Sequence, residues 1–109
     1  MAEAEEFGRK VCDVPGFEHV WVRFATRGYP RKLRREWDEA DADGVQRIVL
    51  RYVQEWNVQD VAGTPVVLPA TPTEHPSSLL DDVEDAVVVW LVRAFQRFWL
   101  VELLAPRPN

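Results

Sequence analysis

Few side chains in this sequence are of the types that perform covalent chemistry. The candidate nucleophiles are Cys12 and the pair Ser77–Ser78, which follows His75 closely. A serine or cysteine becomes an effective nucleophile only when a base such as histidine activates it. Cys12 lies in a segment without periodicity, and Ser77 or Ser78 is equally suited to cap a following helix. These residues therefore indicate loop and capping roles rather than catalysis.

Two pairs of carboxylates, Asp81–Asp82 and Glu84–Asp85, are the other candidates for chemistry, because neighbouring acids can act in general acid–base catalysis. They precede the last apolar segment, where negative charge stabilises the positive end of a helix dipole. One cysteine and two histidines are too few for the three or four ligands of a typical zinc site. GxGxxG, GxxxxGK[ST] and HExxH patterns are absent. We expect no catalytic residue, no metal and no cofactor.

A run of basic residues interleaved with aromatic ones is the one feature typical of nucleic-acid binding. It comprises Arg23, Arg27, Arg31, Lys32, Arg34 and Arg35, with Trp21, Phe24 and Tyr29 between them. Acids from Glu36 to Asp41 follow directly, and some can pair with Arg34 and Arg35 at four-residue spacing. The net charge of −5 also disfavours general affinity for phosphate. The run is interpreted first as an ion-paired or solvated face, next as a protein-docking patch, and last as a nucleic-acid surface.

The size and composition are typical of one small folded domain, with 109 residues of which 47% are hydrophobic and 28% charged. We expect an α+β fold: a mostly helical small domain with an N-terminal strand, a short central hairpin and a long C-terminal helix. Residues 1–16 are expected to be a flexible arm, 17–105 the domain and 106–109 a tail. The N-terminus is acidic and no apolar run reaches about 20 residues, so we expect a cytoplasmic protein without a membrane span.

Hydrophobic periodicity places the elements that precede the central hairpin. Val20, Val22 and Phe24 alternate with polar or aromatic positions, which predicts a strand within 17–25. Pro30 is suited to begin a helix whose apolar stripe includes Leu33, Trp37 and Ala40. Asp43 is expected to cap a second, amphipathic helix. The apolar positions of that helix are Val45, Ile48, Val49, Tyr52, Val53 and Trp56. Trp37, Tyr52 and Trp56 are therefore expected to be structural anchors in the core.

The last helix is expected to run from Ser77 or Ser78 to about Leu104, before Pro106. Three consecutive β-branched residues, Val87–Val89, are equally compatible with a buried strand, but the length of the segment favours a helix. From Ala86 onward its apolar residues cover far more than one face, which indicates a surface for association. The candidate partner-binding residues are Trp90, Arg93, Phe95, Arg97, Phe98 and Trp99.

One stretch of the chain resembles a known family. The pair Trp56–Asn57 is followed by Asp60, Gly63, Pro65 and Leu68–Pro69, and then by the acidic start of a helix. Upstream stand Trp21-Val22-Arg23-Phe24 and the basic Arg31-Lys32-Leu33-Arg34-Arg35. This arrangement, from about Trp21 to Leu91, resembles the tail assembly chaperone family of long-tailed (siphovirus-like) bacteriophages and prophages. The last third departs from the family's pattern, because its helix is longer and more aromatic.

The resemblance implies a non-enzymatic protein that binds the tape measure protein, or tail-tube subunits as well, while a phage tail is assembled in the host cytoplasm. Family members are often made in a short and a frameshift-extended form. The alternative from the residues themselves is a self-associating structural or regulatory module that forms a homo-oligomer through its C-terminal helix. Nucleic-acid binding is a distant third hypothesis.

The acids interleaved with the basic run lead to a prediction about nucleic acid. Any affinity of the chain for DNA or RNA should disappear as salt rises and should not discriminate between sequences, because only phosphate contacts would contribute. Fluorescence anisotropy titrations at several salt concentrations measure this. Salt-resistant, sequence-selective binding would contradict it.

Overall fold

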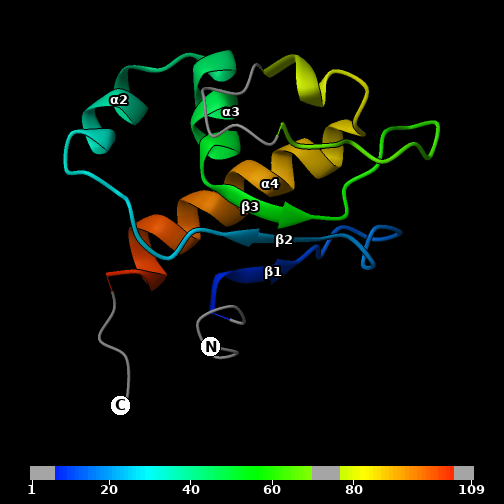
Figure 1. Cartoon of the computed structure of the whole chain (residues 1–109), viewed down its shortest axis with the longest axis horizontal. Coiled ribbons are helices and arrows are strands. Elements are labelled where there is room, and N and C mark those ends of the chain that lie inside the picture. Colours follow the sequence, from blue (N-terminus) through cyan, green and yellow to red (C-terminus); the bar gives the residue numbers. More distant parts are fainter. Residues whose placement is uncertain (1–6, 70–76, 105–109) are drawn as a thin grey trace.

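Three short antiparallel strands form a sheet in the order β1–β2–β3 in the computed structural model, which describes residues 7–69 and 77–104 (Figure 1). Helices pack against one face of this sheet, with α4 crossing behind it. The expected α+β class is confirmed. The strands are β1 (Arg9–Val11), β2 (Trp21–Phe24) and β3 (Val53–Trp56). The helical elements are α2 (Leu33–Glu39), α3 (Ala42–Arg51), the 3₁₀ turn η1 (Ser77–Leu80), α4 (Asp85–Arg97) and the π-helical turn η2 (Phe98–Glu102).

Strand β2 confirms the predicted alternation. Val20, Val22 and Phe24 are buried toward the helices, whereas Trp21 and Arg23 are only partly covered on the other face. On that outer face the Arg23 guanidinium lies 2.9 Å from a carboxylate oxygen of Glu55 on β3. An antiparallel sheet tolerates this arrangement, because one of its faces can remain partly solvated while the other forms the core.

Strand β1 corrects the prediction of a flexible arm over residues 1–16. Arg9–Val11 pairs with β2, and Cys12 is buried beside it. Gly8 allows this approach, because a Cβ there would lie 2.5 Å from the carbonyl oxygen of Phe24. A strand of three residues is too short for an alternating pattern to indicate it. Residues 1–6 of the expected arm and the expected tail 106–109 lie outside the described residues.

Helix α2 begins three residues later than expected. The carbonyl of Pro30 accepts the N–H of Leu33 at 3.0 Å, so residues 30–32 form a tight turn ahead of the helix. The apolar stripe is otherwise as predicted, with Leu33 fully buried and Trp37 half-buried. This short helix therefore depends on its contacts with the core.

The second helix, α3, ends at Arg51, before the predicted stripe is complete. Its cap is Asp41, whose side chain accepts the N–H of Gly44 at 2.8 Å, and not Asp43. Val53 and Trp56 belong to β3 instead, where Val53 pairs with Phe24 and Trp56 with Val22. Pairing with the available edge of β2 decides this, because β-branched and aromatic residues fit a pleated surface at least as well as a helix.

The last helix begins at Asp85, later than the predicted Ser77 or Ser78. Ser77–Leu80 is a separate 3₁₀ turn, in which the Ser77 hydroxyl donates to the carboxylate of Asp43. The break is held by the Asp82 carbonyl, which accepts the N–H of Val61 at 2.8 Å. From Asp85 the chain remains helical to Glu102, close to the expected end, and Val87–Val89 are helical as predicted.

The aromatic residues of α4 and η2 lie in the core, which corrects their prediction as an exposed partner surface. Phe95 and Phe98 are fully buried, and Trp90 and Trp99 are nearly so. Phe95 is the centre of a ring cluster, with ring centroids 5.4 Å from Phe24 and 5.8 Å from Tyr52. The cluster also includes Tyr29, Trp37, Phe98 and Trp99. The sheet, α2 and α3 together cover the apolar side chains of the last helix, for which the sequence alone indicates no covering element.

Replacing Phe95 with Ala should lower the free energy of unfolding by about 3–5 kcal/mol, because a fully buried ring leaves a cavity among several other rings. Chemical denaturation followed by circular dichroism measures this. Val89→Ala on the same helix is the control, since Val89 is 41% exposed and should change stability little. Equal effects of the two substitutions would contradict the position of Phe95 at the centre of the core.

Candidate functional site

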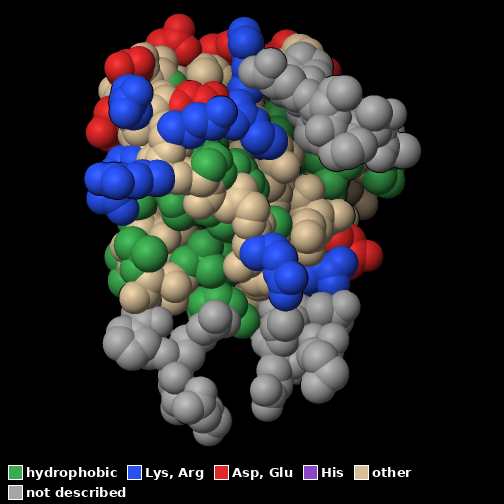
Figure 2. Space-filling model, turned by 60° about the vertical axis from the view of Figure 1, so that its left-hand side comes forward, with side chains coloured by type: hydrophobic (Ala, Val, Ile, Leu, Met, Phe, Trp, Pro, Cys, Tyr) green, Lys and Arg blue, Asp and Glu red, His purple; other side chains and the backbone are tan. Residues whose placement is uncertain are grey.

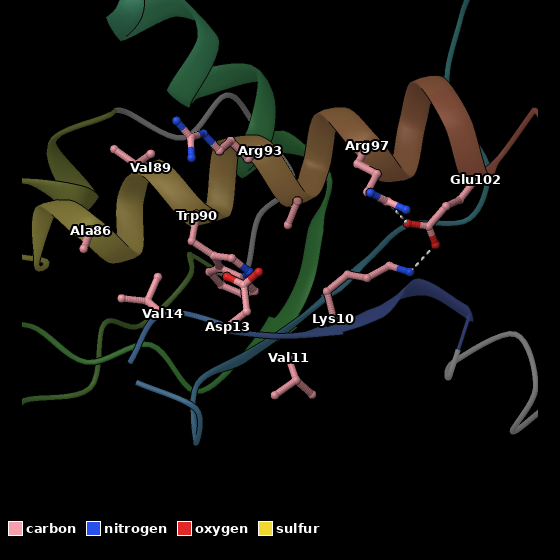
Figure 3. Close-up of a pocket in the computed structure, with 11 residues that line it drawn as sticks. Lys10, Val11, Asp13, Val14, Ala86, Val89, Trp90, Arg93, Arg97 and Glu102 are labelled. Carbon is pink, nitrogen blue, oxygen red and sulfur yellow. Dashed lines mark hydrogen bonds and ion pairs between the residues drawn. The ribbon is translucent and has the colours of Figure 1, made fainter. Parts of the chain in front are cut away.

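A groove runs between strand β1 and helix α4 and is the largest hollow beside the residues predicted to bind a partner (Figure 3). Its volume is about 630 Å³. Side chains from β1, the segment after it, α4 and η2 line it: Lys10, Val11, Asp13, Val14, Ala86, Val89, Trp90, Arg93, Ala94, Arg97 and Glu102. Three of the six predicted partner-binding residues, Trp90, Arg93 and Arg97, therefore lie together here. Phe95, Phe98 and Trp99 do not.

An ion-pair network closes one end of the groove. The Lys10 ammonium on β1 pairs with the carboxylate of Glu102 on η2, and both side chains are mostly buried. The second carboxylate oxygen of Glu102 is 3.9 Å from Nε of Arg97, and Figure 3 shows both cations directed at this acid. The Lys10 ammonium also lies 5.3 Å from the centroid of the Phe98 ring. These contacts hold the end of the helix against the edge of the sheet.

The middle of the groove is apolar and open to solvent. Trp90 projects from α4 toward β1, with Asp13 beside it (Figure 3). Ala86 and Val89 are exposed along the same helix. Arg93 is exposed and has no ion pair within the described part of the chain. The groove thus offers apolar contact area with one cation free to meet an acid.

The outer edge of β1 has backbone groups next to this groove that no other strand of the described residues pairs with. The N–H of Cys12 donates to the carbonyl of Val20, so the hydrogen bonds of Val11, one residue earlier, point away from β2. Trp21, opposite Val11, bonds in the other direction, to Asn57. Val11 is 56% exposed. Hydrophobic periodicity does not predict strand β1. The only local signal for an ordered segment there is the adjoining apolar pair Val11–Cys12.

Several of the residues that carry the family resemblance, from Trp56 at the end of β3 onward, build one structural unit. The indole of Trp56 donates to the carbonyl of Val66 at 2.8 Å, which makes this half-buried residue an anchor for the following excursion. The side chain of Asn57 joins that unit to β2: Nδ2 donates to the His19 carbonyl at 2.8 Å, and Oδ1 accepts the N–H of Trp21 at 2.7 Å. Each of these side chains therefore has a role in holding the fold.

Where the sequence predicts a short hairpin, the structure has a tight turn whose two sides are joined by a single isolated bridge and are not strands. The carboxylate of Asp60 accepts the N–H groups of Ala62 and Thr64, both at 2.9 Å, and fixes the turn. Gly63 has a φ of 85°, a conformation that a residue with a Cβ rarely adopts. Gln59 and Pro65 then form an isolated antiparallel bridge. The spacing of Asp60, Gly63 and Pro65 is thus explained by the geometry of this turn.

The basic run is divided between two elements, and the expected pairing within it is wrong. Arg23 lies on β2, whereas Arg31, Lys32, Arg34 and Arg35 lie on α2 and the turn before it. Glu36 binds Arg51 of α3 through both carboxylate oxygens, at 2.8 and 3.2 Å. This hydrogen bonding lowers the pKa of Glu36. Within the described chain, the four cations of α2 and its turn have no ion pair of their own.

The candidate nucleophiles are not assembled into a catalytic arrangement in the described residues. Cys12 is buried, and desolvation raises the pKa of its thiol. Ser77 bonds to Asp43 as described above, and His75 lies outside the described residues. No group of three potential metal ligands occurs within residues 7–69 and 77–104.

Comparison with known proteins adds no identification. No protein-family model matches the chain, and neither a curated protein nor a solved structure does. Among the described helices, none is both long and apolar enough to cross a membrane. Any inference about function therefore depends on the fold and on the groove.

Replacing Asn57 with Ala should lower the free energy of unfolding by about 1–2 kcal/mol, because the side chain loses one donor and one acceptor bond to the start of β2. Asn57→Asp keeps the acceptor and removes the donor, so a smaller loss is expected. Thermal and urea denaturation compare the two variants. If both were as stable as the native chain, Asn57 would not connect the excursion to the sheet.

Proposed function

We propose that this chain is a non-enzymatic, chaperone-like protein of phage tail assembly that binds and shields the tape measure protein before the tail tube encloses it. The β1–α4 groove is the binding site. The observation that carries the proposal is the combination, in one place, of a strand edge left unpaired among the described residues and exposed apolar side chains on the neighbouring helix. Such a surface is suited to a protein segment rather than to a small substrate.

Recognition in the groove would use both of its walls. An extended segment can hydrogen-bond to the outward-facing backbone of Val11, while its alternate side chains contact Ala86 and Val89 on α4. Arg93 would select an acidic side chain in that segment. A tape measure protein exposes apolar stripes before assembly, and covering part of such a stripe prevents aggregation until the tube subunits displace the chaperone.

The resemblance to tail assembly chaperones also supports this proposal. The matching residues Trp56, Asn57, Asp60 and Gly63 all stabilise one unit attached to β2. A pattern made of fold-forming residues is a reason to expect a shared architecture. The resemblance therefore bears on the scaffold, and the groove bears on the binding function.

Self-association is the second candidate function, and the same strand edge favours it. Two copies of β1 can pair antiparallel about a two-fold axis, which would join two sheets and cover Val11 in both copies. This arrangement uses the edge of the sheet rather than the aromatic residues of the last helix, which are in the core. Sedimentation velocity at several protein concentrations distinguishes the two candidates, because self-association raises the sedimentation coefficient with concentration and a monomer keeps it constant.

Co-expression with the tape measure protein of the encoding phage or prophage tests the main proposal. The native chain should copurify with that protein and increase its soluble amount. Val89→Glu places a charge in the apolar wall of the groove and should reduce the copurified amount about tenfold or more.

Val67→Glu is the matched control, because Val67 is exposed and does not line the groove. It should leave copurification unchanged. A native chain that neither copurifies with the tape measure protein nor keeps it soluble would overturn the proposal. Equal losses in both variants would remove the groove as the binding site.

A further inference from the structure

A second hollow, lined by aromatic and basic side chains, lies where the turn before α2 meets the end of the last helix. Tyr29, Pro30, Arg31, Arg34, Trp99 and Leu104 line it, and its volume is about 440 Å³. None of these residues lines the β1–α4 groove. An inference drawn here is therefore independent of the proposed chaperone site.

The walls of this aromatic–basic hollow are rigid and apolar. The Trp99 ring stacks at 6.4 Å from Tyr29 and meets the Trp37 ring edge-on at 5.5 Å, so its position is fixed from two sides. The Tyr29 hydroxyl donates to the Ala25 carbonyl at 2.8 Å, which fixes the opposite wall. Leu104 is 67% exposed at the rim. An aliphatic side chain entering here would find a preformed apolar surface.

Cations surround the opening. Arg31 and Arg34 belong to the hollow itself, and together with Lys32 and Arg35 they line an adjoining depression. None of the four has an ion pair among residues 7–69 and 77–104, in contrast to Arg23 and Arg51. Figure 2, which brings the α2 side of Figure 1 forward, shows Lys and Arg side chains gathered beside hydrophobic ones. Four cations held close together, with Asp38 as the one acid among the residues that line this depression, favour an anionic partner.

We propose that the aromatic–basic hollow is a docking site for an acidic segment of a partner protein, in which an aliphatic side chain stands between carboxylates. The carboxylates pair with Arg31 and Arg34, whose planar guanidinium groups bind carboxylate through two hydrogen bonds. The aliphatic side chain packs against Trp99 and Leu104. Charge complementarity gives the contact its specificity, and the apolar wall keeps the segment in place.

A peptide fits this surface better than a nucleic acid does. Asp38 lines the adjoining depression, and two more acids, Glu39 and Asp41, follow it closely in the sequence. A phosphate backbone carries a continuous line of charge that would meet these acids, whereas a short segment with a few carboxylates meets only the arginines. The net charge of −5 also disfavours a nucleic acid at this surface.

Fluorescence anisotropy with labelled peptides tests this inference. The probe is a short peptide with a leucine between two pairs of glutamates; one matched peptide has glutamines in place of the glutamates and another has serine in place of the leucine. The native chain should bind the probe more tightly than either matched peptide. Arg31→Glu combined with Arg34→Glu should reduce affinity for the probe about tenfold or more.

The control is Arg9→Glu combined with Arg47→Glu, which changes the net charge equally at two exposed residues outside the hollow. It should retain most of the affinity, and Leu104→Ser should lose several-fold. Absence of probe binding to the native chain would overturn the inference, as would equal losses in the two double variants. Preferred binding of single-stranded oligothymidylate would assign the hollow to nucleic acid, and self-association that Arg31→Glu with Arg34→Glu abolishes would assign it to a second copy.

Discussion

The packing of aromatic rings around Phe95 is the interaction on which the rest of this structure depends. Its ring lies against Phe24 of the sheet, Tyr52 at the end of α3 and Trp37 of α2, so one side chain joins the helical layer to the strands. In a domain of 109 residues the buried area is small, and large rings supply much of it per residue. The short helix α2 is held by the fully buried Leu33, by the packing of Trp37 against Phe95 and Trp99, and by the Glu36–Arg51 pair.

The same packing explains where the two proposed binding surfaces lie. Because the rings of α4 and η2 face inward, the large apolar side chains that stay exposed among the described residues are aliphatic, such as Val89 on α4 and Val11 on β1. They border a groove at a strand edge that has no partner strand within residues 7–69 and 77–104, and natural strand edges are usually covered or protected by charge. The aromatic–basic hollow lies beside the same core, and Trp99, which its neighbours hold nearly fully buried, is one of the residues that line it. The position of both surfaces therefore follows from which side chains the core buries.

Much of the fold could be predicted from local pattern. The alternation at Val20, Val22 and Phe24 predicted β2, and the 3.6-residue periodicity at Val45, Ile48 and Val49 predicted α3, because each element buries one face. The site was only partly predictable. Trp90, Arg93 and Arg97 were found from the apolar surplus of the last helix, but β1, the other wall of the groove, has no periodicity to reveal it.

The sequence by itself determined the elements whose apolar residues recur at one period, and the turn whose geometry requires Asp60 and Gly63. Only the tertiary structure decided the assignments in which one pattern suits two outcomes. Val53 and Trp56 continue a helical stripe but pair with β2, because the backbone hydrogen bonds of a sheet edge compete with one more helical turn. Likewise, Phe95 and Phe98 are apolar, but the sequence does not specify which elements cover them. Burial is a property of the assembled layers, and no local pattern specifies whether a neighbouring layer comes from the same chain or from another.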